Sequence, residues 1–191
     1  MPLFLSLCLA LLVALGAAAC RSQSDEAAAS TLPPFVPDVT IKELMLNVID
    51  TNADVVWLSV TTVASAEGLV ETRPKTDEEW ARVRAGAITL AEAANLLMIP
   101  GRRVARPGEK SETPGVELEP EEMDVLIAKD RASWDKHARA LYDAAMIAAK
   151  AAERKDADKI FEIGESIEHA CEGCHRSYWY PNEKIPELPA Q

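Results

Sequence analysis

The distribution of proline is the feature of this sequence that most restricts its fold. Proline inside a helix costs about 3 kcal/mol, because it removes a backbone hydrogen bond and clashes with the preceding turn. The 12 prolines fall into five groups along the chain: Pro2; Pro33, Pro34 and Pro37; Pro74; Pro100, Pro107, Pro114 and Pro120; and Pro181, Pro186 and Pro189. Long helices are therefore expected only in the stretches between these groups.

Four of these stretches carry apolar residues at helical spacing, and none shows a sustained alternation with period 2. The second opens with a capping box, Thr76 to Glu79, and the first stops at Gly68. In order along the chain the four stretches are residues 38–67, 76–99, 121–152 and 157–180. The predicted fold is all-α: an antiparallel up-down-up-down four-helix bundle occupying residues 38–180.

The connection between the second and third stretches, residues 100–119, is long and rich in proline, glycine and charge. Connections of this length without secondary structure are uncommon inside compact domains. We predict that it is a mobile surface loop.

The first 20 residues carry no charged side chain and have the pattern of an export signal. The apolar run Leu3–Leu15 is followed by the small residues 16–19. A permanent membrane helix is the alternative, although the longer run Leu3–Ala19 lies at the lower length limit for spanning a bilayer and no basic cluster follows it.

Cys20 closes this apolar segment directly after three alanines. The segment resembles a bacterial lipoprotein signal, in which such a cysteine becomes the lipidated first residue of the mature protein. An ordinary signal cleaved near Ala19 is the alternative. We predict export to the periplasm with a lipid anchor at Cys20, a flexible tether over residues 21–37 and a short tail at 181–191.

A second pair of cysteines lies in the motif Cys171-Glu172-Gly173-Cys174-His175. CxxCH is the attachment sequence of c-type haem. Cysteines three residues apart lie on one helical face and reach the two vinyl groups of one porphyrin, and the adjacent imidazole reaches the iron. A chance CxxCH is expected roughly once in a thousand such chains. We therefore predict one covalent haem c, attached at Cys171 and Cys174, with His175 as an axial ligand.

Three other interpretations of the motif remain open. A thioredoxin-like dithiol requires a βαβ context, which the helical pattern does not provide. A zinc site using both cysteines with His169 or His175 lacks a second ligand pair at a familiar spacing. A structural disulfide between neighbouring turns of one helix would be strained.

Met45 is the predicted second axial ligand. In an up-down-up-down bundle the end of the fourth helix lies level with the start of the first. At 1.5 Å per residue, His175 lies roughly 8 Å from its helix end and Met45 roughly 9 Å from the start of the first helix. Met45 as ordinary core filling is the alternative. The other residues considered, which match less well in position, are Met98, Met123, Met146, His137 and His169.

With these residues in place, the chain resembles a class II c-type cytochrome, the group of cytochrome c′ and cytochrome c556. The resemblance rests on Met45 in IKELMLNVID, on CEGCH, and on Tyr178 three residues after His175, and it covers about residues 38–180. It implies an antiparallel four-helix bundle that often dimerises, with haem held by two thioethers and a histidine. Cytochrome c556-type members add a methionine from the first helix, whereas cytochrome c′ members leave that face without a ligand and bind small gases there.

The formal net charge is −11, from 31 acidic against 20 basic residues. This balance argues against binding nucleic acid by bulk charge and favours a redox partner protein with a basic docking surface. The expected function is non-enzymatic electron transfer through a His/Met-ligated haem. The alternatives are a gas-binding or sensing protein with five-coordinate haem, and a non-haem metal-binding or structural bundle.

Overall fold

A computed structural model of the chain describes residues 35–66 and 68–183. The predicted export signal at 1–20, the predicted lipid site Cys20, and most of the predicted tether and tail lie outside the described residues. None of the helices in the described part of the chain is long and apolar enough to cross a membrane.

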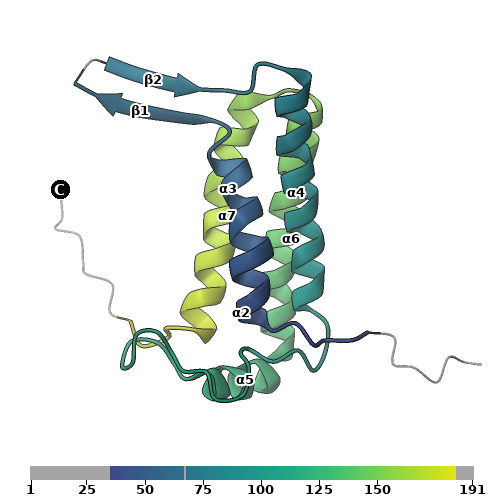
Figure 1. The fold of residues 1–191 in the computed structure, drawn as a ribbon, viewed down its shortest axis with the longest axis vertical. Coiled ribbons are helices and arrows are strands. Elements are labelled where there is room, and N and C mark those ends of the chain that lie inside the picture. The colour runs from purple at the N-terminus through teal and green to yellow at the C-terminus, as the bar shows by residue number, and fades with distance from the viewer. Residues whose placement is uncertain (1–34, 67, 184–191) are drawn as a thin grey trace, which may run out of the picture. The chain divides into compact units, whose positions relative to one another are not determined.

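The described chain is mostly helical, in agreement with the coarse prediction of an all-α fold, and it also contains one small sheet that the sequence analysis did not predict. The helices α3, α4, α6 and α7 lie side by side (Figure 1), with α4 against α6, α6 against α7, and α3 against both α4 and α7. The elements are α2 (Ile41–Leu44), the π-helical turn η1 (Met45–Ile49), α3 (Asp50–Trp57), β1 (Thr61–Ser65), β2 (Gly68–Thr72), α4 (Asp77–Leu97), α5 (Pro120–Lys129), α6 (Arg131–Glu153) and α7 (Ala157–Tyr178).

Helix α4 begins where the capping box predicts. The Glu79 backbone N–H donates to the Thr76 hydroxyl at 3.2 Å, and the Thr76 N–H donates to the Glu79 carboxylate at 3.0 Å. The two bonds satisfy donors that the first helical turn leaves free. The helix ends at Leu97, before Pro100, as predicted.

Alanine forms much of the contact between α4 and α6. Small side chains let two helices approach closely. The fully or almost fully buried alanines of these two helices are Ala87, Ala91, Ala93, Ala94, Ala145, Ala148, Ala151 and Ala152. Larger apolar residues complete the core around this contact, such as Leu90, Val56 and Ile167.

The prediction of one helix over residues 38–67 was wrong for its last third, residues 58–67. The helix ends at Trp57, and the chain then forms an antiparallel hairpin of β1 and β2. The reason is local: Val60, Thr61, Thr62 and Val63 are a run of β-branched residues, which lose side-chain freedom in a helix and favour strands. In the hairpin Val63 faces Val70 across the two strands, and Ser65 faces Gly68 at the turn.

The third predicted stretch is also interrupted, because α5 ends and α6 begins at Asp130. Asp130 has a non-helical backbone conformation, with φ −130° and ψ 60°. Its carboxylate accepts the Ser133 backbone N–H at 3.2 Å and so caps α6. An aspartate favours such a cap over a helix interior, because its short carboxylate competes for nearby backbone N–H groups.

The prediction that residues 100–119 are a mobile surface loop is not supported by their packing. The N–H groups of Ile41 and Lys42 donate to the carbonyls of Arg103 and Val104, both at 2.9 Å, so this segment pairs with the first turn of α2. Val104 is buried, and the Leu118 N–H donates to the Trp179 carbonyl at 2.8 Å. The segment is therefore fixed at both ends.

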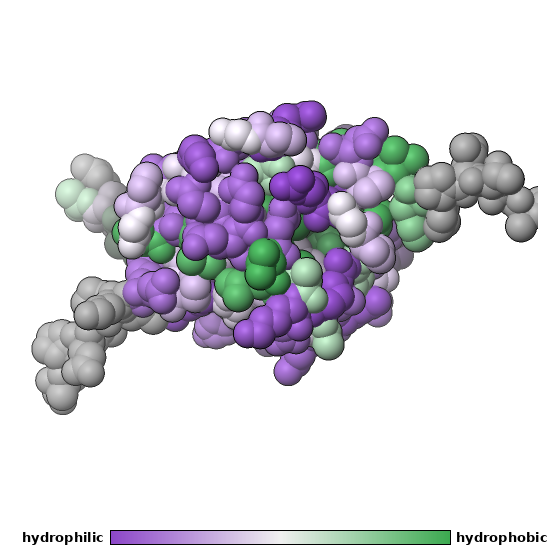
Figure 2. All heavy atoms as spheres, turned by 90° about the horizontal axis from the view of Figure 1, so that it is seen from below, coloured by the Kyte–Doolittle hydropathy of each residue, from purple (hydrophilic) through white to green (hydrophobic). Residues whose placement is uncertain are grey.

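The end of the molecule that carries this segment and α5 is seen face-on in Figure 2. Its surface is mostly hydrophilic, with a small group of apolar residues at its centre. Ion pairs bind the segment to its surroundings: Arg106 with Glu43 at 2.6 Å, and Arg103 with Asp124 at 2.9 Å. Residues 100–119 therefore form an ordered cover over this end of the helices.

Candidate functional site

The last turns of α7 position the CxxCH motif. Helix α7 runs without a break to Tyr178, so Cys171 and Cys174 lie one turn apart on it. Both thiols are free, and both residues line a pocket between α3, α6 and α7, which we call the helix-side pocket. The neighbouring His175 lines the same pocket.

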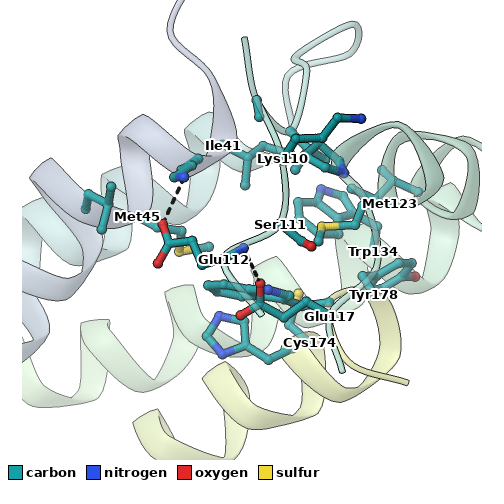
Figure 3. Close-up of a pocket in the computed structure, with 18 of the residues that line it drawn as sticks. Ile41, Met45, Lys110, Ser111, Glu112, Glu117, Met123, Trp134, Cys174 and Tyr178 are labelled. Carbon is teal, nitrogen blue, oxygen red and sulfur yellow. Dashed lines mark hydrogen bonds and ion pairs between the residues drawn. The ribbon is translucent and has the colours of Figure 1, made fainter. Parts of the chain in front are cut away.

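A second pocket adjoins the first and is closed by the segment 100–119, so we call it the loop-side pocket. Cys174 and His175 line it together with Met45, which lines the helix-side pocket as well. Figure 3 shows Met45 and Cys174 reaching this pocket from different helices. The structure therefore brings the predicted second ligand, Met45, to the same cavity as the motif.

Met45 is the first residue of the π-helical turn η1. The Asp50 N–H donates to the Met45 carbonyl, five residues back, whereas an ordinary α-helix bonds four residues back. The extra residue in this turn rotates the preceding helix α2 relative to α3. A π-turn of this kind is frequent at functional sites, where it re-aims a side chain.

The walls of the loop-side pocket are mostly apolar. Met123, Ile127 and Trp134 are buried there, and Trp134 is fixed because its indole N–H donates to the Leu97 carbonyl at 2.9 Å. The ring of Tyr178 meets that of Trp134 edge-on, with centroids 5.2 Å apart. The cavity has a volume of about 160 Å³ and is partly open to solvent.

Charged residues close the loop-side pocket toward solvent. Lys42 pairs with Glu112 at 2.9 Å, and the Glu112 backbone N–H donates to the Glu117 carboxylate at 2.9 Å, as the dashed lines in Figure 3 indicate. These residues come from α2 and from the segment 100–119. The pocket therefore has an apolar interior and a charged rim.

His175 is half-buried between charged and aromatic neighbours. Its Nδ1 lies 3.9 Å from the Glu172 carboxylate, and its ring meets Trp179 edge-on at 5.0 Å between centroids. Burial lowers the pKa of His175, and the nearby carboxylates of Glu172 and Asp50 oppose that effect only in part. The imidazole is therefore neutral at physiological pH, the form that binds a metal.

The two thiols are also held in their neutral form. Burial raises the pKa of Cys171 and of Cys174 to about 12, and the carboxylates of Glu168 and Asp50 reinforce the shift at Cys171. A redox-active dithiol works through a thiolate with a lowered pKa. The surroundings of these cysteines thus disfavour the thioredoxin-like interpretation.

We expect both thiols to react slowly in the folded, haem-free chain. At mildly alkaline pH a pKa of about 12 leaves roughly a thousandth of the thiolate present at the ordinary value, so alkylation by iodoacetamide should slow roughly a thousandfold relative to the chain in urea. Mass spectrometry of the alkylated peptides measures the rates. As pH rises from the ordinary thiol range toward 12, the unfolded chain releases these protons first, so the haem-free fold should lose stability.

An added thiol at Glu165→Cys serves as the control, because Glu165 is exposed on the same helix. It should react at the ordinary rate in the folded chain. Equal rates at Cys171, Cys174 and the added cysteine would contradict the burial of the motif thiols.

The other residues considered as ligands lie in different surroundings. Met123 lines the loop-side pocket, although it stands at the start of α5, so its sequence position alone understated its closeness to the motif. His137 lines the helix-side pocket, where its Nε2 lies 3.4 Å from the Ser177 hydroxyl. Met98 caps the end of α4, and His169 is exposed beside Glu165.

Sequence reasoning missed several residues of the site. Asp50 lines both pockets and faces His175 closely enough that the two affect each other's pKa. Asp50 follows Met45 by five residues. Two residues at this spacing lie on the same helix face only across a π-turn, and no sequence pattern predicts that turn. The contributions of Lys42 and Glu112 depend on how the segment 100–119 folds back.

Comparisons with known proteins yield no relative. No family model matches the chain, and neither curated proteins nor solved structures match it significantly. Across residues 35–66 and 68–183, no group of three or more His, Cys, Asp or Glu side chains is arranged to hold a bare metal ion.

Proposed function

We propose that this protein is an exported electron carrier of the class II c-type cytochrome kind, with one covalently attached haem. The observation that carries the proposal is the meeting of Met45 with Cys174 and His175 around one apolar cavity. In this proposal α3, α4, α6 and α7 form an antiparallel up-down-up-down bundle, and Cys20 holds the protein to a membrane through lipid.

The residues present suit a haem in their chemistry. Two neutral thiols one turn apart are the groups that form thioethers with vinyl carbons, and a neutral imidazole and a thioether are the side chains that ligate haem iron in electron carriers. Buried Met123, Ile127 and Trp134 offer an apolar wall to a porphyrin face. Haem supplies reversible one-electron chemistry when bound.

Each residue has a distinct role in this proposal. Cys171 and Cys174 would fix the group covalently, His175 would provide one axial ligand and Met45 the other. A thioether opposite an imidazole raises the reduction potential, and the apolar walls tune it further by keeping water away. The charged rim at Lys42 and Glu112 would limit access from solvent.

A row of carboxylates runs along α7 up to the CxxCH motif. These negative charges favour a partner with a basic surface. They recur at intervals of three and four residues, which places them along one side of the helix. These residues are Asp158, Glu162, Glu165, Glu168 and Glu172. We propose that a basic redox protein docks over this side, with an association rate that falls as ionic strength rises.

Spectra of the full chain, produced with haem-attachment machinery, test the proposal. We expect reversible oxidation and reduction, a low-spin spectrum in both states, and no change when carbon monoxide is added to the reduced protein. A high-spin reduced spectrum that shifts with carbon monoxide would instead assign the protein to gas binding or sensing. A chain that acquires no haem would contradict both functions.

A further inference from the structure

The chain folds back around His175 directly after the end of α7. The backbone N–H groups of Trp179 and Tyr180 both donate to the His175 carbonyl, at 2.7 and 3.0 Å. The Trp179 carbonyl in turn accepts the Leu118 N–H at 2.8 Å, so the segment 100–119 fixes this turn from its other side. The turn therefore holds Trp179 and Tyr180 beside His175.

The carboxylate of Glu172 is held at both of its oxygens. The Tyr180 hydroxyl donates to Oε1 at 2.7 Å, and the Arg176 guanidinium donates to Oε2 through Nε at 3.2 Å. Hydrogen bonds to a charged group are stronger than those between neutral groups, and two of them on one carboxylate restrict its rotation. The packing of the helix end thus determines where this negative charge lies.

The fixed carboxylate faces one particular nitrogen of His175. Glu172 precedes His175 by three residues, a spacing that places the two on one helix face, and its Oε1 lies 3.9 Å from the His175 Nδ1. This separation is too long for a direct hydrogen bond, but a small rotation of the imidazole or one bridging water is enough to join the two groups. The Trp179 ring, edge-on to the imidazole at 5.0 Å between centroids, limits larger rotations.

A carboxylate beside Nδ1 determines which nitrogen of the imidazole is free to bind a metal. It favours the neutral tautomer with the proton on Nδ1, which leaves the lone pair on Nε2. Metal-ligating histidines commonly have such a partner, which also makes the ligating nitrogen a stronger donor. Glu172 therefore prepares the Nε2 of His175 for ligation.

A second pair of His and Glu on α7 shows how an ordinary surface contact differs. His169 and Glu165 lie 4.0 Å apart, and their side chains are 73% and 78% exposed. The side chains of His175 and Glu172 are only 24% and 33% exposed. Water screens the first pair strongly and the second pair much less, so the charge of Glu172 acts on His175 with greater effect.

We propose that Glu172 is a positioning residue of the haem site: its fixed carboxylate sets the tautomer of His175, strengthens the donation by Nε2 and lowers the reduction potential. Stronger donation stabilises oxidised iron more than reduced iron, and the negative charge acts in the same direction. Glu172 would thus offset part of the rise in potential that Met45 produces. The inference rests on the proposed function, because it takes His175 as an axial ligand.

Potentiometry of the haem-loaded full chain tests the proposal. Glu172→Gln should shift the one-electron equilibrium toward the reduced form by about tenfold, which corresponds to about 59 mV. Glu172→Asp keeps the charge but withdraws the carboxylate by one methylene, so it should shift the equilibrium in the same direction by a smaller factor. Nitrogen NMR of the haem-free chain gives an independent readout: the wild type should hold the proton on the Nδ1 of His175, and Glu172→Gln should admit the tautomer with the proton on Nε2.

Glu168→Gln is the matched control, because it removes the same charge one turn earlier on α7, where Glu168 lines the helix-side pocket. It should move the equilibrium less than about twofold and leave the tautomer unchanged, and helical circular dichroism should be the same in all variants. Equal shifts in Glu168→Gln and Glu172→Gln would overturn the proposal, since charge alone would then set the potential. A Glu172→Gln variant with the potential of the wild type would overturn it as well, whereas a chain that acquires no haem would overturn the proposed function and this inference with it.

Discussion

The chain with both Cys171→Ser and Cys174→Ser is expected to retain no haem after denaturation, whereas the wild type retains its full complement. A c-type haem stays on an unfolded chain only through thioether bonds, and these two residues are the free thiols that line the candidate site. Each single variant keeps one thioether and should retain haem in lower yield. A pyridine haemochrome assay on denatured protein, together with the mass of the intact chain, measures the result.

Glu165→Ser provides the control, because it alters an exposed residue of the same helix and leaves the motif intact. It should retain haem like the wild type. Haem that survives denaturation in the double cysteine variant would contradict attachment at the motif. A wild type that carries zinc in place of haem, and loses it in the double variant, would assign the motif to metal binding.

Much of the helical pattern could be predicted from local chemistry. The capping box at Thr76 and the proline at 100 set the limits of α4, because both act within one or two turns of the helix end. The polar turn before α7 is similar: the Asp156 carboxylate accepts the Lys159 N–H at 3.0 Å and so begins the helix. Such signals need no knowledge of the remaining chain.

The features that the sequence did not reveal have two causes: competition between two possible local structures, and contacts between distant parts of the chain. Val63 fits a helical pattern by its spacing. Its β-branched neighbours favour a strand, however, and in the structure it lies in β1. Asp130 fits the middle of a long helix by position, yet its carboxylate caps a new one. The composition of residues 100–119 predicted a mobile loop. The segment is ordered by backbone hydrogen bonds to α2, which no local sequence pattern indicates.

In the candidate site, too, the residues set by a local motif could be predicted and those set by tertiary packing could not. Cys171, Cys174 and His175 were found because a short motif with fixed spacing carries the chemistry. Met45 was found by comparing depths along two helices, a comparison that assumed the rise of a regular α-helix. The π-turn at Met45 and the presence of Asp50 beside His175 depend on tertiary packing, so the sequence alone did not reveal them.

Replacing the proposed axial methionine should change the properties of the haem without changing its attachment. In Met45→Leu we expect loss of the methionine–iron charge-transfer band of the oxidised protein, binding of carbon monoxide by the reduced protein, and a lower reduction potential. The drop should be on the order of 0.1–0.3 V, within the roughly 0.8 V over which axial ligands tune haem. Leucine keeps nearly the volume of methionine, so the fold should lose less than about 1.5 kcal/mol of stability.

Met123→Leu makes the same substitution in the same pocket, since Met123 lines it from α5. This control variant should keep the band, the potential and the resistance to carbon monoxide. If Met123→Leu loses the band and Met45→Leu keeps it, ligation by Met45 is wrong and α5 provides the ligand. If the wild type has no such band and binds carbon monoxide, the iron has a free face, and the space beside Met45 is a gas-binding pocket. The pair of variants therefore separates the two haem functions with one side chain exchanged at two positions of a single cavity.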